Sequence, residues 1–188
     1  MRAQFIIDYV LTNHSGRLLR SLLNFNVRRM KPERFTVQLS KKGIAKSASF
    51  PKLPKYGLYV IRSGNKVIRI GETASGSARL KKGFREPLRR VIRNKDRKNY
   101  IAYSWRNKYR GRRLSVDYFS LGDDAFSDAK LRRAVEAEVT FQFRLARKKW
   151  PEEMSEIHFL EQYQRDPRVV DVTKEILEHY GHEYNSSA

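Results

Sequence analysis

The sequence contains no cysteine. This absence excludes disulfide scaffolds, zinc sites built from thiolates and a cysteine nucleophile, so any metal ion must bind to oxygen or histidine ligands. Long apolar runs are missing too. Residues 5–11 are apolar but are interrupted by Asp8 and are far too short for a membrane span or a secretory signal. We therefore expect a cytoplasmic protein, nucleoid-associated if its source is bacterial, with no membrane partner.

Acidic residues are few compared with basic ones. The chain has 20 Asp/Glu against 40 Lys/Arg, which gives a formal net charge of +20. Residues 1–150 carry 37 Lys/Arg and 11 Asp/Glu, whereas residues 151–188 carry 3 and 9. A one-signed charge of this size favours a polyanionic partner, and nucleic acid is the one we expect. Charge alone does not indicate an enzyme.

The length of 188 residues is enough for one well-packed core. The leucines at 18, 19, 22 and 23 have helical spacing, and Phe35, Val37 and Leu39 alternate as in a strand. The pair Pro51 and Pro54 indicates a connection before the next unit. We predict an N-terminal extension over residues 1–55, a main domain over 56–160 and an acidic helical tail over 161–188.

The main domain has the pattern of an α+β fold. Two β-rich runs, 58–61 and 67–70, flank Ser63-Gly64-Asn65, which suits a tight hairpin. Further elements are predicted from capping residues and apolar periodicity. They are a helix from Ser75 or Ser77 to Lys82, a helix over 87–94, a strand over 114–118, and a long helix from Ser127 or Asp128 to Lys148. The expected fold is a small three-stranded antiparallel sheet flanked by helices, with an N-terminal helical and strand extension and a C-terminal helical tail.

Three short motifs occur in order along this domain. They are Gly57-Leu58-Tyr59, Ile70-Gly71-Glu72-Thr73, and Arg79-Leu80 followed by Phe84. In this order and spacing the chain resembles the GIY-YIG nuclease superfamily over roughly residues 56–160. The resemblance implies that the two tripeptide motifs lie on the hairpin and that the arginine lies on the following helix. It also implies hydrolysis of phosphodiester bonds in DNA, as in restriction or mobile-element enzymes.

The resemblance assigns roles to Tyr59 and Arg79. Tyr59 would be the general base or would orient the attacking water, although a phenol with a pKa near about 10 needs nearby cations to act at neutral pH. Arg79 would bind the phosphate, because its planar guanidinium suits two phosphate oxygens and stays charged. The alternative for Tyr59 is a strand tyrosine that only packs.

The resemblance also implies a metal-binding glutamate on the long helix, and Glu136 and Glu138 are the candidates. The apolar stripe of this helix favours Glu138, because a carboxylate at the edge of a core stripe needs a partner. A structural salt bridge is the alternative to a metal. One carboxylate completed by water suits Mg²⁺, with Mn²⁺ as a substitute. The four histidines lack a zinc-binding arrangement.

The chain departs from the family pattern in three places, one of which is that the asparagine often found downstream of the glutamate has no equivalent near Pro151 to Phe159. Arg69 stands where the second motif usually has an aromatic residue, and Gly83 stands where a histidine often follows the arginine. Lys81 or Lys82 could supply the missing phosphate contact. The candidate catalytic residues are therefore Tyr59, Arg79, Glu138, Arg69 and Lys82, with Glu138 as the metal ligand.

A basic segment follows the arginine helix, and most of its charges are expected to bind the DNA backbone. The candidates are Arg85, Arg89, Arg93, Arg97, Lys98, Arg106, Lys108, Arg110, Arg112 and Arg113. Four interleaved aromatic residues, Tyr100, Tyr103, Trp105 and Tyr109, either stack on DNA or pack on the third strand.

Two hypotheses of different class follow. The leading one is an endonuclease that cuts double-stranded DNA, either as a homodimer that presents two copies of one site or as a monomer that nicks each strand in turn. The other is a basic nucleic-acid-binding module whose GIY-YIG-like domain has lost its chemistry, as the residues at 69 and 83 would suggest.

Overall fold

The predicted hairpin forms as two antiparallel strands. The computed structural model describes residues 30–46, 50–85, 104–122, 124–163 and 165–186, and Lys31–Ala188 form one compact unit. Within that unit, β2 (Gly57–Ser63) pairs with β3 (Lys66–Thr73). Gly64 in the turn has a φ of 57°, which glycine adopts more easily than other residues. The predicted turn chemistry is therefore confirmed.

The sheet has four strands, in the order β1-β4-β2-β3. Strand β4 (Arg113–Ser120) pairs with β2, and β1 (Glu33–Gln38) pairs with β4, with Phe35 opposite Val116. The α+β class is confirmed, but the predicted number of three strands is wrong. The strand that the sequence placed in an N-terminal extension joins the sheet, because its alternating apolar residues continue the buried face of β4.

One face of the sheet is covered by α2 (Gly76–Arg85) and by the 3-10 helix η1 (Ser104–Tyr109). A chain of aromatic rings fills this layer. Phe50 contacts Phe84 at 6.0 Å between ring centroids, Phe84 contacts Trp105 at 5.9 Å, and Trp105 contacts Tyr109 at 6.0 Å. Of the aromatic residues in the basic segment, Trp105 and Tyr109 therefore pack in the core.

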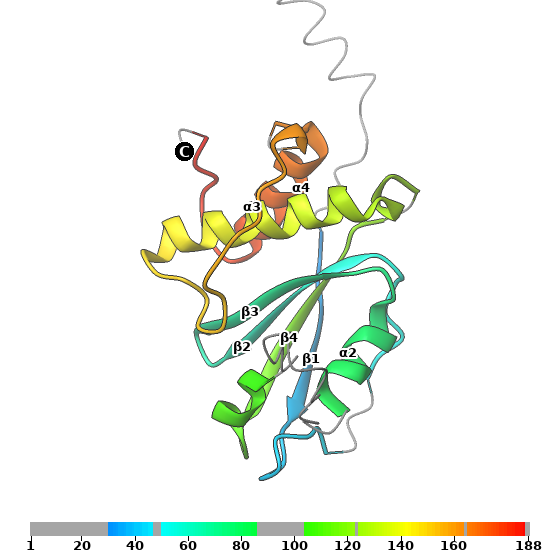
Figure 1. Cartoon of the computed structure of the whole chain (residues 1–188), viewed down its shortest axis with the longest axis vertical. Helices are drawn as coiled ribbons and strands as arrows, with labels where there is room; N and C mark the ends of the chain where they lie inside the picture. The colour runs from blue at the N-terminus through cyan, green and yellow to red at the C-terminus, as the bar shows by residue number, and fades with distance from the viewer. Residues whose placement is uncertain (1–29, 47–49, 86–103, 123, 164, 187–188) are drawn as a thin grey trace, which may run out of the picture. The chain divides into compact units, whose positions relative to one another are not determined.

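The long helix α3 (Ala129–Arg147) lies across the other face of the sheet, with α4 (Pro167–His179) packed beside it (Figure 1). Asp128 caps α3, because its carboxylate accepts a hydrogen bond from the Lys130 amide at 2.8 Å. Two further 3-10 turns, η2 (Asp124–Ser127) and η3 (Glu161–Tyr163), precede α3 and α4. The helices predicted near residues 18–23 and over 87–94 lie outside the described residues.

The described helices include none with the length and apolar character that crossing a membrane requires.

A buried carboxylate joins the sheet to the C-terminal segment. The Asp117 side chain on β4 is fully buried and forms ion pairs with Arg34 of β1 at 2.6 Å and Arg62 of β2 at 2.9 Å. The Tyr180 hydroxyl, at the end of α4, donates a hydrogen bond to the same carboxylate at 2.7 Å. Burial raises the pKa of Tyr180, and the Asp117 charge acts in the same direction. One side chain therefore ties β1, β2, β4 and α4 together.

We expect Asp117→Asn to lower the free energy of unfolding by about 1–3 kcal/mol, because it removes the charge that pairs with the mostly buried Arg62, whereas Arg34 is 55% exposed and can be solvated by water. Urea denaturation followed by circular dichroism measures the change. Glu156→Gln is the control, since its ion pair with His158 is solvent-exposed and is expected to contribute less than about 1 kcal/mol. Equal stability of the two variants would contradict the role given to Asp117.

Candidate active site

Two motif glycines make room for tyrosine rings on the sheet. A Cβ atom at Gly71 would collide with the ring and hydroxyl of Tyr59, and a Cβ atom at Gly57 would collide with those of Tyr118. The Tyr118 hydroxyl donates to the Pro54 carbonyl at 2.7 Å. Both glycines are therefore required by close packing against an aromatic ring. Tyr59 is only 5% exposed, with its hydroxyl over β3.

Tyr59, Arg69 and Arg79, which the sequence predicted as catalytic, border one small cavity on the α2 face. The cavity has a volume of about 10 Å³ and is also lined by Trp105. Arg69 Nε and Trp105 Nε1 are buried and have no hydrogen-bond partner among the residues that the structure describes. Buried donors without an acceptor are unfavourable, and a cavity of this volume has room for about one oxygen atom, such as that of a water molecule, to accept from them.

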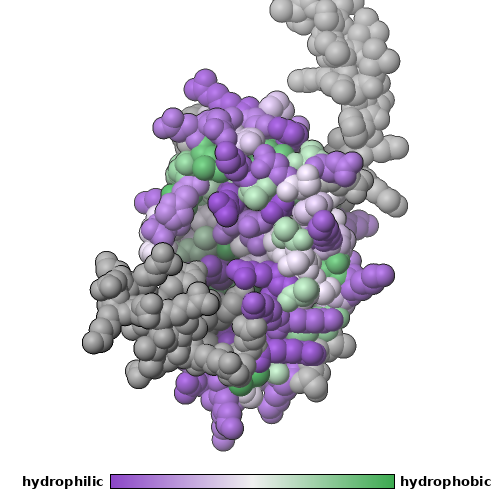
Figure 2. Space-filling view, turned by 45° about the vertical axis from the view of Figure 1, so that its right-hand side comes forward, coloured by the Kyte–Doolittle hydropathy of each residue, from purple (hydrophilic) through white to green (hydrophobic). Residues whose placement is uncertain are grey.

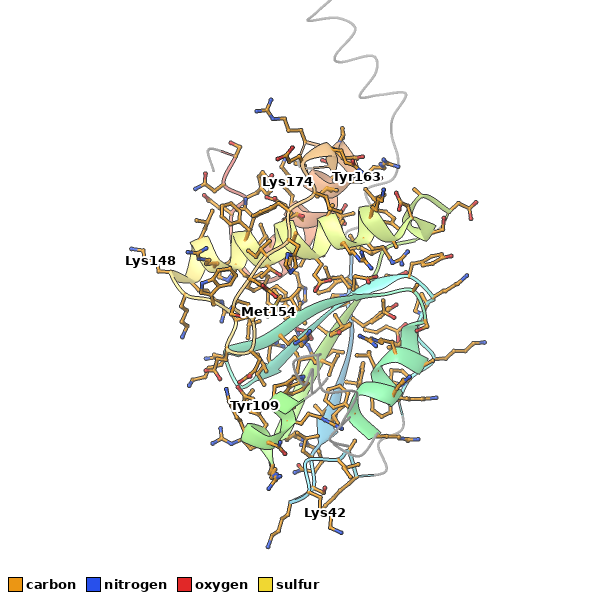
Figure 3. The ribbon with its side chains drawn as sticks, in the orientation of Figure 1. Lys42, Tyr109, Lys148, Met154, Tyr163 and Lys174 are labelled. Atoms are coloured by element: carbon orange, nitrogen blue, oxygen red, sulfur yellow. The ribbon has the colours of Figure 1, made fainter. Side chains whose placement is uncertain are left out.

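Strand β3 is an edge strand, and backbone groups on its outer side bond to side chains and to a segment that follows α3. The Glu72 amide donates to the Glu136 carboxylate at 3.3 Å, and the Ile70 amide contacts the Met154 sulfur at 3.3 Å. Figure 3 shows Met154 between β3 and α3. The edge thus places Glu136 of α3 beside the second motif.

Electrostatic coupling connects Glu136 to both faces of β3. Burial raises the pKa of Glu136 to about 7, and the neighbouring Glu72 charge also raises it. Arg69, which borders the cavity on the α2 face, lowers the same pKa, as does Arg133. The Glu72 carboxylate is itself paired with the buried Arg132 at 2.7 Å. Glu136 is thus a half-buried carboxylate that a cation would stabilise.

Glu138, the predicted metal ligand, lies on the other side of α3. It is 8% exposed and accepts a hydrogen bond from the Gln142 side chain at 2.9 Å. The same Gln142 amide group donates to the Asn185 carbonyl, so Glu138 lies close to the C-terminal segment. Helix α3 is covered on two sides, by the sheet and by α4, so its apolar stripe does not identify the side that faces β3. The structure therefore brings Glu136, rather than Glu138, to the hairpin motifs.

The donor chemistry near Glu136 fits Mg²⁺, because the carboxylates of Glu136 and Glu72 are hard oxygen ligands. No cluster of three or more His, Asp or Glu side chains suited to a metal occurs among the residues placed by the structure. A magnesium ion here would therefore have one or two carboxylate ligands, and water would complete its coordination. Such sparse protein coordination is usual for Mg²⁺.

The remaining predicted residues divide into three groups. Lys82 is exposed on α2 and does not line the cavity with Tyr59. The prediction that Arg106 contacts DNA is wrong, because its side chain is 1% exposed and donates to the Phe84 carbonyl at 2.6 Å. Five of the predicted DNA-binding side chains are exposed and are therefore accessible to DNA: Arg85, Lys108, Arg110, Arg112 and Arg113. The other four, Arg89, Arg93, Arg97 and Lys98, lie outside the described residues.

The exposed basic surface includes two lysines outside the predicted basic segment. Lys41 and Lys42 lie in a turn whose Ser40 carbonyl accepts a hydrogen bond from the Gly111 amide at 3.2 Å. They therefore lie beside Arg110 and Arg112, and Figure 3 shows Lys42 pointing outward at this end of the sheet. Hydrophilic residues also dominate the face drawn in Figure 2. Residues 41–42 and 110–112 are far apart in the sequence and come together because β1 pairs with β4. The sequence alone therefore gave no signal that they share a surface.

Comparisons of the chain with protein-family models, with curated proteins and with solved structures found no match.

We expect Gly71→Ala to destabilise the protein by about 1–3 kcal/mol, because the new methyl group and the Tyr59 ring cannot occupy the same space. The effect should shrink in a Tyr59→Ala background, where the obstructing ring is absent. A double-mutant cycle measured by urea denaturation gives the coupling between the two positions. Full additivity would contradict the packing explanation for this glycine.

Glu136 should make stability depend on pH. Its pKa is about 7 in the folded protein, above the ordinary value of 4.5, so the folded state binds the proton more tightly. Stability should therefore fall as pH rises from about 4.5 to 7 and then level off. Glu136→Gln removes this loss, so the variant should exceed the wild type by up to about 3 kcal/mol at pH 8 and by less at pH 5. The exposed Glu161→Gln, measured in parallel, should show no such divergence.

Proposed function

We propose that the protein is a metal-dependent endonuclease that hydrolyses phosphodiester bonds in double-stranded DNA, with its active site at the β3 edge. The observation that supports this most strongly is the gathering of Tyr59, Arg69 and Arg79 around one cavity, where the buried Arg69 Nε has no partner among the residues that the structure describes. These residues come from β2, β3 and α2. The motif order that suggested the family is compatible with this arrangement.

Each residue has a role that its position permits. Arg79 and Arg69, whose Nε has no partner within the described part of the chain, would bind oxygens of the scissile phosphate, where negative charge increases in the transition state. The Tyr59 hydroxyl would orient the attacking water. The water oxygen forms a bond to phosphorus while the bond to the leaving sugar oxygen breaks, and the products are a phosphomonoester and an alcohol. The two arginines stabilise this charge without requiring a change of protonation.

Glu136 would hold the divalent ion, with the Glu72 carboxylate nearby. A bound Mg²⁺ would supply positive charge to the reacting phosphate and favour ionisation of an attacking water. Glu136 takes the role for which the sequence favoured Glu138. Because the pKa of Glu136 is about 7, its affinity for a cation should increase as pH rises through neutrality.

The competing proposal is a non-catalytic nucleic-acid-binding module. One observation favours it: Tyr59 has a packing role over Gly71 that would retain this motif without any chemistry. Supercoiled plasmid incubated with Mg²⁺, with EDTA as control, separates the two proposals. Metal-dependent nicking supports the nuclease, and tight DNA binding without nicking of diverse substrates supports the module.

We expect Arg79→Ala, Arg69→Ala and Glu136→Gln each to reduce single-turnover cleavage by at least about 100-fold, because each removes charge directed at the reacting phosphate or at the metal. DNA affinity should change much less, since many other cations contribute to it. Glu138→Gln is the matched comparison on the same helix and should keep most of the cleavage activity. Loss of cleavage in Glu138→Gln, with normal cleavage in Glu136→Gln, would return the metal role to Glu138.

A further inference from the structure

A cavity of about 340 Å³ lies beside Glu136, between α3 and the segment Met154–Leu160. Apolar side chains form much of its wall: Ala137 from α3, and Met154, Ile157 and Leu160 from the segment that follows it. Its volume lies within the range of about 300–1,000 Å³ usual for small-molecule sites. It can therefore hold one flat ring system but not a double helix.

The inner polar groups of this cavity are hydrogen-bond acceptors. Glu72 and Glu136 contribute carboxylates, each with one oxygen already bonded, to Arg132 and to the Glu72 amide, so one oxygen of each can meet a base when no metal ion is bound. The buried Thr140 hydroxyl donates its proton to the Glu136 carbonyl at 2.7 Å, so only its lone pairs remain. The exposed side chains at the rim are Arg133, His158 and Glu156, and the Glu156 carboxylate pairs with His158 at 3.4 Å, so Arg133 is the rim cation without a carboxylate partner in this lining. A matching ligand has apolar faces, a donor edge turned inward and a negative charge beside Arg133.

On DNA, this description fits a nucleobase that bears an amino group. Cytosine and adenine present an exocyclic amine, and guanine presents adjacent N1–H and N2–H donors that match a carboxylate. Thymine offers a single donor between two carbonyl acceptors, which would face the carboxylates unfavourably. The backbone phosphate of the same nucleotide would remain outside, within reach of Arg133.

We propose that this cavity receives one unstacked cytosine, adenine or guanine of the bound DNA, next to the phosphate that is cleaved. The inference depends on the proposed function, since it takes DNA as the substrate. It adds a substrate class: DNA in which one nucleotide near the cleavage position is unpaired or easily extruded. Extruding a paired base costs a few kcal/mol, and an unpaired base avoids much of this cost.

The test compares affinities in EDTA for four 30-base-pair duplexes of one sequence. One is fully paired, and three carry a single bulged cytosine, guanine or thymine. We expect the cytosine and guanine bulges to bind at least about tenfold more tightly than the paired duplex, and the thymine bulge to gain less. Ile157→Trp, which fills the cavity from the partly exposed segment, should abolish this preference and leave paired-duplex affinity unchanged.

Leu145→Trp is the matched control, because it places the same ring on an exposed position of α3 that does not line this cavity. Thermal melting of both variants checks folding, and the wild-type comparison of bulged bases needs no variant. Equal affinity for paired and bulged duplexes, an equal gain for thymine, or an unchanged preference in Ile157→Trp would overturn the inference. Bulge preference without plasmid nicking would instead overturn the nuclease proposal and leave the base site standing.

Discussion

The open edge of β3 is the constraint on which the candidate site depends. An edge strand leaves backbone groups unpaired on one side, and buried backbone groups need partners. Here the Glu72 amide donates to the Glu136 carboxylate, and the Ile70 amide contacts the Met154 sulfur. The carbonyls of Val67 and Ile68 accept hydrogen bonds from the amides of Glu152 and Glu153 at 3.0 and 2.9 Å, respectively. These bonds fix both a carboxylate of α3 and the segment that walls the adjacent cavity.

Helix α3 is held in this position from its other side. The carboxylate of Asp117 ties three strands to Tyr180 at the end of α4, and the Tyr180 ring lies 5.0 Å from that of Phe143 on α3. The acidic C-terminal segment is therefore a structural support for the helix that carries Glu136. Its excess of negative charge over positive charge distinguishes it from the basic surface at Lys41, Lys42 and the start of β4.

The glycines and the polar residues of the motif region have different structural explanations. Gly57 and Gly71 are explained by the rings of Tyr118 and Tyr59, which lie directly over the backbone, so packing alone accounts for these glycines. Arg69 is different, because close packing does not require a guanidinium with a buried Nε that lacks a partner among the described residues. The proposed chemistry therefore depends on the polar residues around the cavity rather than on the glycines.

Local sequence was enough to determine the hairpin at Gly64, strand β4 and helix α3 with its Asp128 cap, because turn geometry, alternation and capping act within a few residues. The motif resemblance put Tyr59 and Arg69 on the two strands of the hairpin, and the observed register, with Gly71 opposite Tyr59 and Arg69 opposite Ile61, brings both side chains to one cavity. Only the tertiary structure decided that β1 joins the sheet, that Arg106 is buried and that Glu136 faces β3. Each of these three outcomes depends on which other element packs against the residue, and the local sequence does not determine which side of a helix or strand another element covers. Helix α3 is the clearest example, because it is packed between the sheet and α4 and therefore has two buried sides. Its apolar pattern does not distinguish these sides, so the sequence could not show whether Glu136 or Glu138 meets the edge of β3.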